Sequence, residues 1–219
     1  MKICKICGRE IVNKNVSHCS KQCVAKNKLS SLEETDIQVA LTGIFGDGHI
    51  GKSSGKYHTY STNSKYKEYI DYKKSMLRTL IPSGTRESTN RGYKKAKIYS
   101  FSTYEHSILS YMAENSVENN LKMLSLLGVA LWFYDDGSLH YSKHFYNLNT
   151  HKFSEEIQYD LFIPFFKNIL DVKATIAYDR KTDGRVFTYL RFNKSDSNAT
   201  NINELLKKYP IHCFKYKTF

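Results

Sequence analysis

The stretch VALWFYDDG at residues 129–137 decides the fold, together with a second stretch, VALTGIFGDG, at residues 39–48. Each stretch is an apolar run that ends in Asp-Gly and passes directly into residues suited to a β-strand. Apolar residues recur at helical spacing within and just before both runs. We therefore predict two helices, which end at Gly48 and Gly137 in the left-handed conformation in which helices commonly end.

Asp47 and Asp136 fall at the last turns of these two predicted helices. A carboxylate is unfavourable there because the C-terminal end of a helix carries the negative pole of the macrodipole. If the two helices pack together, the carboxylates meet, and each raises the free-energy cost of ionising the other. A bound divalent cation would offset both penalties. We interpret the two aspartates as functional residues that are kept against their local preference.

The segments after the two aspartates repeat one order of elements: two strands, a helix, two strands and a closing helix. Ser64 and Ser154, which open the inner helices, follow the aspartates by 17 and 18 residues. The matching offsets indicate an internal duplication of an αββαββα unit.

Local signals predict where individual elements begin and end. Thr35 or Asp36 can cap the first motif helix. The inner helix of the first copy should stop before Pro82, and Pro164 should cause a kink or a restart in the inner helix of the second copy. A turn that ends at Gly184 predicts a hairpin near the end of the second copy.

The composition favours a polyanionic partner. The 219 residues carry a formal net charge of +12 and include 17 tyrosines, and tyrosine with lysine and arginine suits a surface that grips a sugar-phosphate backbone. The N-terminus lacks the apolar core of a signal peptide, and the longest apolar run, residues 126–134, is shorter than the roughly 20 residues of a membrane helix. We expect an intracellular, cytoplasmic protein (in a nucleoid, a phage-infected cell or an organelle) with reduced cysteines.

Four of the five cysteines form two close pairs in the first 23 residues. The spacing of Cys4, Cys7, Cys19 and Cys23 is that of a tetrahedral structural zinc site. The segment is too short to fold by apolar burial, so Zn²⁺ would supply most of its folding free energy. With seven basic residues and one acidic residue, it should bind nucleic acid. A disulfide pair is the alternative, which a reducing compartment disfavours.

The two stretches resemble the paired signature of LAGLIDADG homing endonucleases, in the variant spelled roughly GxxxGDG and WFxDDGS, here at residues 43–48 and 132–138. The resemblance extends from about residue 36 to the C-terminus, where PIHCFKYK at residues 210–217 is similar to the family's YKL-like ending. It implies an α+β fold, with tandem αββαββα repeats that form two antiparallel sheets shaped as a saddle over DNA. The motif helices would pack centrally, where Ala40, Gly43, Gly128 and Ala130 allow close approach.

The expected domain organisation has two repeats preceded by the small N-terminal zinc module. Its segments are a zinc-binding module at 1–28, a linker at 29–35, the first LAGLIDADG repeat at 36–112, a linker at 113–120 and the second repeat at 121–219.

The resemblance implies hydrolysis of both strands of a long double-stranded DNA target, leaving short 3′ overhangs, by an enzyme of an intron-encoded or phage mobile element. Asp47 and Asp136 match the family's metal-binding acids, and Gly46 and Asp135 could add backbone carbonyl ligands. Such hard oxygen ligands favour Mg²⁺ over zinc.

The family also places a basic residue near each site, on a late strand. Lys97, 50 residues after Asp47, is the better match and is the predicted catalytic base. Arg185 is at the comparable position of the second copy, but an arginine cannot serve as a base at neutral pH. The basic role in the second site therefore stays open, with Lys181 as a second candidate.

Basic and histidine side chains of the predicted strands and turns are the expected DNA contacts. They are Lys56, His58, Arg86, Arg91, Lys94, Lys95, His140, Lys143, Arg180, Lys181, Arg185 and Arg191.

Two alternatives use the same fold without DNA cleavage: a maturase that binds intron RNA, and a sequence-specific DNA-binding regulator. Both would tolerate loss of the acidic pair, so the retention of Asp47 and Asp136 favours the nuclease. Because one chain supplies both motifs, we expect a monomer, with double-stranded DNA as the partner and no association with membranes.

Overall fold

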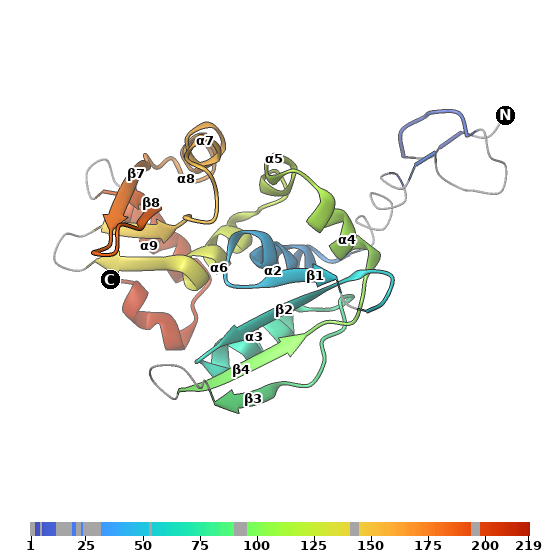
Figure 1. The fold of residues 1–219 in the computed structure, drawn as a ribbon, viewed down its shortest axis with the longest axis horizontal. Helices are drawn as coiled ribbons and strands as arrows, with labels where there is room; N and C mark the ends of the chain where they lie inside the picture. The colour runs from blue at the N-terminus through green and yellow to red at the C-terminus, as the bar shows by residue number, and fades with distance from the viewer. Residues whose placement is uncertain are drawn as a thin grey trace.

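The computed structural model describes residues 3–4, 6–11, 19–20, 23, 32–52, 54–89, 96–140, 145–193 and 198–219. Two four-stranded antiparallel sheets flank a central pair of helices, α2 (Glu34–Phe45) and α6 (Leu126–Asp136), so the predicted α+β architecture is confirmed (Figure 1). The described residues contain no helix that is long and apolar enough to cross a membrane.

Each half of the chain builds its sheet in the same strand order, which confirms the duplication. The first sheet has the order β1-β2-β4-β3 and the second has the order β5-β6-β8-β7. The elements of the first half are β1 (His49–Lys52), β2 (His58–Ser64), α3 (Lys67–Met76), β3 (Arg86–Thr89), β4 (Lys97–Ser102) and α4 (Ser107–Glu114). Those of the second half are β5 (Gly137–His140), β6 (Phe145–Asn149), α7 (Glu155–Ile157), a π-helical segment η2 (Gln158–Phe162), α8 (Ile163–Leu170), β7 (Thr175–Arg180), β8 (Val186–Phe192), α9 (Asn198–Lys208) and the 3₁₀ segment η4 (His212–Lys217).

The central helices approach each other closely at Gly128. A Cβ atom at this position would lie 2.1 Å from Oε1 of Gln38. The Gln38 side chain accepts a hydrogen bond from the backbone N–H of Ser125 and donates one to the carbonyl oxygen of Met123, so it ties α2 to the start of α6. The prediction for Gly43 was wrong, because Gly43 instead packs against its own sheet, where a Cβ atom would meet the Ile50 side chain at 2.7 Å.

Aromatic rings fill the core between the motif helices and the second repeat. The buried Trp132 ring contacts Phe45 of α2 at a centroid distance of 5.0 Å and Phe162 at 5.3 Å. Such pairs contribute about 0.5–1.5 kcal/mol each beyond the burial of their area. The core therefore joins both halves and holds the C-terminal ends of α2 and α6 together.

The motif helices do not end as predicted. Gly137 has φ −84°, and α2 ends at Gly46 with φ −101°, whereas the described glycines in the left-handed region are Gly8 and Gly184. The chain leaves each helix in an extended conformation because β1 and β5 begin almost at once. Gly184 does form the predicted hairpin turn, closed by a hydrogen bond from its N–H to the carbonyl of Lys181.

Two other predicted boundaries also differ. α2 begins after Glu33, and neither Thr35 nor Asp36 caps it. The buried carboxylate of Asp36 instead accepts hydrogen bonds from the backbone N–H groups of residues 78–80, beyond the end of α3. This contact turns the chain away after Met76, earlier than the predicted stop before Pro82.

Pro164 produces the predicted restart. The helix that Ser154 caps widens into η2 and resumes as α8, with Pro164 in its first turn. Proline lacks an N–H and its ring clashes with the carbonyl four residues earlier, and a π-turn before the proline relieves both problems. The segment 113–120, expected as a linker, is largely helical, because α4 extends to Glu114 and α5 (Val117–Leu121) follows it.

Candidate active site

Asp47 and Asp136 meet where the two central helices end. Asp136 is the last residue of α6, and Asp47 follows Gly46, the residue that caps α2. Their carboxyl groups hydrogen-bond to each other. Asp47 is exposed and Asp136 is partly buried, so both can be reached from solvent. The structure thus brings the two predicted acids into one site.

Both carboxyl groups of this pair are difficult to ionise. Partial burial, followed by the charges of Asp47 and Asp135, raises the pKa of Asp136 to about 8. Although part of the Asp47 residue is exposed, desolvation of its carboxyl group within the cluster, followed by the charge of Asp135, also raises the pKa of Asp47. Without a cation, the pair therefore holds a proton at neutral pH, as two adjacent carboxylates do when they cannot both ionise.

Asp135 has a different role from its neighbour. Its side chain is 1 % exposed, and its carboxylate accepts hydrogen bonds from Nζ of Lys73 at 2.8 and 2.9 Å and from the Tyr69 hydroxyl at 2.6 Å. It also accepts a hydrogen bond from the backbone N–H of Asp47 at 3.3 Å. A Cβ atom at Gly46 would lie 2.2 Å from Oδ2 of Asp135, so only glycine fits opposite this carboxylate.

Lys73 is fully buried in α3 and is charged there because of its partners. Burial alone would lower its pKa, but the charge of Asp135, a hydrogen bond to it and the charge of Asp47 together raise the pKa of Lys73. Burial and the charge of Asp135 raise the pKa of Tyr69 well above its usual value. This buried cluster ties α3 of the first repeat to α6 of the second.

Two further lysines cap the ends of the motif helices. Lys152 donates from Nζ to the carbonyl oxygen of Gly46 at 2.8 Å. Lys217 donates to the carbonyl oxygens of Phe133 and Tyr134 at 3.1 and 2.7 Å. The last carbonyls of a helix have no partner within the helix, and a positive charge there opposes the negative end of the macrodipole. The lysines therefore offset the unfavourable position of the two aspartates.

The environment makes both capping lysines easier to deprotonate. Burial lowers the pKa of Lys217 to about 8, although the charges of Asp135 and Asp47 oppose the shift. Burial also lowers the pKa of Lys152, against the opposing charges of Asp136 and Asp135.

Sequence reasoning missed Lys73, Lys152 and Lys217 as site residues. Lys217 had one usable signal, since it ends the PIHCFKYK segment that resembles the family's C-terminal motif. Lys152 lies in the short connection between β6 and α7, and Lys73 lies in the middle of α3. Neither position marks a residue as functional without the tertiary structure.

Lys97, the predicted base, lies outside this cluster. It begins β4 and forms an ion pair with Glu87 at 2.8 Å, with both side chains more than half exposed. Arg185 and Lys181 belong to the β7–β8 hairpin, where they pair with Asp183 and Asp179 at 2.7 and 2.6 Å. The structure brings none of these three side chains into the described contacts of Asp47 and Asp136.

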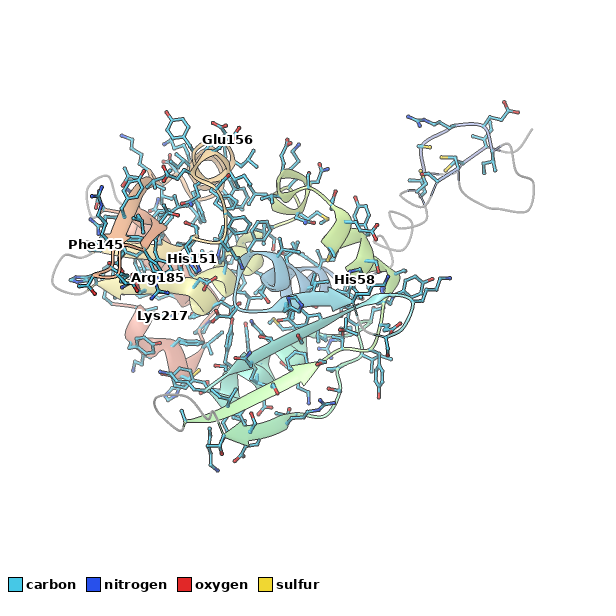
Figure 2. All side chains as sticks on the ribbon, in the orientation of Figure 1. His58, Phe145, His151, Glu156, Arg185 and Lys217 are labelled. Carbon is cyan, nitrogen blue, oxygen red and sulfur yellow. The ribbon has the colours of Figure 1, made fainter. Side chains whose placement is uncertain are left out.

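Open sheet faces hold only part of the predicted DNA contacts. Lys56 lies in the exposed turn before β2, Arg86 on β3, His140 at the end of β5 and Arg180 at the end of β7. Arg191, on β8, is partly buried. Arg185, another predicted contact, lies at the second sheet (Figure 2).

His58 lies on the other face of its sheet. Its Nδ1 is 2.9 Å from the Ser110 hydroxyl of α4. Side chains alternate along β2, so His58 lies on the same face as Tyr60 and Thr62, which are buried. We therefore leave His58 out of the proposed DNA surface. Arg91, Lys94, Lys95 and Lys143 lie outside the described residues.

A groove runs from Asp136 across the second sheet. Its volume is about 470 Å³, and its lining includes Ser138, Asn147, Asn149 and Tyr189. A larger hollow of about 690 Å³ lies away from the aspartates, and its acidic rim (Glu155, Glu156 and Asp160) does not suit a nucleic acid. Of these two hollows, the groove on the second sheet is the one that Asp136 lines, and Lys181 lines it as well.

The four N-terminal cysteines converge. The Sγ atoms of Cys4, Cys7, Cys19 and Cys23 all lie within 4.8 Å of one another, and all five cysteines of the chain are free. Gly8, with φ 71°, closes the tight turn around the first pair, Cys4 and Cys7, and its N–H donates to the carbonyl of Cys4. Hydrogen bonding from the Cys19 backbone lowers the pKa of Cys4 to about 6, whereas side-chain hydrogen bonds with Cys7 and Cys23 raise the pKa of Cys19 to about 12, so Cys4 ionises more readily than Cys19.

The fold consists of two pseudo-symmetric halves, and each half contributes a central helix with an aspartate at its end. These features define a class of proteins in which one chain carries two copies of the same motif. The model of the LAGLIDADG DNA endonuclease family matches residues 37–199, most of the chain, and the chain belongs to this family.

Solved structures share this fold over most of the chain. The homing endonuclease I-WcaI, solved bound to its DNA recognition sequence, superposes with a TM-score of 0.69 and 19 % identity over 95 % of both chains. The N-terminal LAGLIDADG domain of DUF199/WhiA has a TM-score of 0.50 and 13 % identity over 79 % of this chain and 82 % of that one. No curated protein matches the chain. At these identities the similarity establishes the fold.

Proposed function

We propose that the protein is a site-specific homing endonuclease that hydrolyses both strands of a double-stranded DNA target and leaves short 3′ overhangs. The observation that carries this proposal is the pairing of Asp47 with Asp136 at the ends of two symmetry-related helices. Membership of the LAGLIDADG DNA endonuclease family supports it. So does the similar fold of I-WcaI, which was solved bound to its DNA recognition sequence.

The acidic pair fits a divalent cation of the Mg²⁺ type. Burial first, and then the charges of neighbouring carboxylates, raise the pKa values of the pair, so a cation bound to both groups would offset the free-energy cost of ionising them. Carboxylate and carbonyl oxygens are the ligands that hard divalent cations prefer. When bound, such a cation would supply an activated water and positive charge for phosphodiester hydrolysis.

We infer that Lys152 and Lys217, and not Lys97, are the positively charged residues of the active site. Their ammonium groups border the acidic pair, since the charges of Asp47 and Asp136 act on both. Fixed positive charge beside a reacting phosphate stabilises the negative charge that develops in the transition state. In this proposal Asp135, Lys73 and Tyr69 position Asp47 and do not contact the DNA.

The zinc proposal rests on the four converging cysteines. Metal analysis of the purified protein should find about one zinc per chain, and the Cys7→Ser variant should lose it. A full chain with an ordered N-terminal module and no bound metal would contradict the proposal. In this module Zn²⁺ is structural, and its basic residues would add affinity for DNA.

Selection of cleavage sites from randomised double-stranded DNA in Mg²⁺ tests the main proposal. The expected result is one long enriched sequence, cut on both strands with a short 3′ overhang. Enrichment by binding without cleavage would indicate a regulator. Failure to bind DNA, together with specific binding to a structured RNA, would indicate a maturase.

A further inference from the structure

Arg191 occupies a defined row on the open face of the second sheet. Ser138 of β5 pairs with Asn147 of β6, and Asn147 pairs with Arg191 of β8. The neighbouring row, Leu148 and Leu190, is buried and lies on the opposite face. Asn147 also lines the groove that starts at Asp136. Arg191 therefore stands on the open sheet face that the resemblance to LAGLIDADG homing endonucleases places over DNA.

The guanidinium of Arg191 is held in one orientation by its neighbours. Nε donates to Oδ1 of Asn147 at 3.4 Å, and Nη2 donates to the Tyr189 hydroxyl at 2.7 Å. The guanidinium carbon lies 4.6 Å from the centroid of the Phe145 ring, and this ring also stacks on His140 at 4.8 Å. A long side chain that is ordered before binding loses less conformational entropy when it contacts a ligand.

The outer end of the guanidinium stays available. Both hydrogen bonds use Nε and Nη2, and Nη1 has no hydrogen-bond partner among the described residues. No carboxylate of the described chain pairs with Arg191, whereas Lys181 and Arg185 of the nearby hairpin are both ion-paired. The fork formed by Nη1 and Nη2 matches O6 and N7 of guanine, the commonest specific contact in the major groove.

The first sheet has no equivalent group. Its corresponding row consists of His49, Ser61 and Ser102, so a serine stands where the second sheet has Arg191. The two halves of a target would therefore be read differently at this position, in spite of the pseudo-symmetry of the fold.

We propose that Arg191 reads a guanine in the half of the target bound by the second repeat, with Asn147, Tyr189 and Phe145 as the residues that position it. This inference rests on the proposed function, because it assumes that the open sheet faces contact DNA bases. It makes Arg191 a specificity-determining residue, distinct from basic residues that contact phosphates and carry no sequence information.

The test is selection of bound sequences from randomised DNA in Ca²⁺, for the parent protein, Arg191→Gln and Arg185→Gln. The two variants lose the same charge, and thermal melting confirms that each is folded. The parent should enrich guanine at one position of one half-site, and Arg191→Gln should lose this preference by about 5- to 150-fold in favour of adenine. Arg185→Gln should weaken binding to all sequences equally.

An unchanged guanine preference in Arg191→Gln would overturn the inference while leaving the endonuclease proposal intact. So would an equal loss of affinity for all sequences in that variant, because it would indicate a phosphate contact. A parent protein that enriches no sequence would overturn both proposals.

Discussion

Asp135 joins the two halves of the chain through charge. Its carboxylate and the Lys73 ammonium are buried together, with side chains 1 % and 0 % exposed. Removing one partner of a buried ion pair leaves an uncompensated charge, which costs about 3–5 kcal/mol. Removing both partners leaves no such charge.

We therefore expect Lys73→Met and Asp135→Asn each to lower the free energy of unfolding by about 3 kcal/mol. The double variant should lose much less than the sum of the two single losses. Chemical denaturation of the four proteins measures this coupling. Additive losses would mean that the pair does not act as a unit.

The raised pKa of Asp136 makes stability depend on pH. Between about pH 4 and pH 8 the folded chain keeps a proton on Asp136 that the unfolded chain has lost. This group's contribution to stability therefore falls as pH rises through that window and is constant above it. In the Asp136→Asn variant this loss of stability does not occur, because asparagine does not ionise.

The stability advantage of Asp136→Asn over the parent should grow by up to about 1.4 kcal/mol per pH unit from pH 5 to pH 8. Denaturation at each pH measures it. Asp171→Asn is the matched control, because the hydrogen bond and charge of Lys167 lower the pKa of Asp171, so its titration lies below this range. If the difference in unfolding free energy between Asp136→Asn and the parent did not change with pH, the pKa of Asp136 would not be raised.

At the scale of elements, the packing of α2 on α6 depends on Gly128. Gly128→Ala would force its methyl group against Gln38 and disturb the hydrogen bonds to Ser125 and Met123. Overpacking of this kind costs about 1–3 kcal/mol.

Gly84→Ala is the control for this substitution, because a Cβ atom at Gly84 would have no neighbour within 4 Å. Denaturation should find Gly128→Ala destabilised and Gly84→Ala nearly unchanged. Equal stability of both variants would mean that the helices can separate without cost.

The sequence allowed the elements to be predicted because their spacing is repeated. The offsets of Ser64 and Ser154 from the two aspartates indicated the duplication, and Pro164 marked the restart of a helix. Ser154 caps its helix as predicted, but Ser64 ends β2, and α3 begins after Tyr66.

Helix ends were less predictable. The Asp-Gly pairs suggested left-handed caps, but the chain enters a strand at once in both copies. Gly137 is itself paired with Leu148, and Gly48 directly precedes β1, which begins at His49.

The candidate site was predictable only where it belongs to the motifs. Asp47 and Asp136 end two recognisable helices, and the structure brings them together. Lys73, Lys152 and Lys217 come from three distant segments. Among 33 basic residues nothing local distinguishes Lys73 and Lys152, and Lys217 is marked only by its place at the end of PIHCFKYK. Their proximity to the acids arises from tertiary packing, which spacing along the chain does not encode.

At the scale of the whole molecule, one chain supplies both halves of the site. The central pair that single-motif relatives would obtain by dimerising is formed here by α2 and α6 of the same chain. Sedimentation should therefore find a monomer, both alone and bound to one DNA duplex. An obligate dimer would contradict this expectation.

The most direct test of the central claim compares cleavage and binding for the parent, Asp47→Asn and Asp136→Asn on the selected target. Asparagine keeps the shape of each side chain but removes the charge that would attract a divalent cation. Each variant should lose double-strand cleavage in Mg²⁺ and largely retain target binding in Ca²⁺. Full cleavage by either variant would exclude that aspartate from the active site.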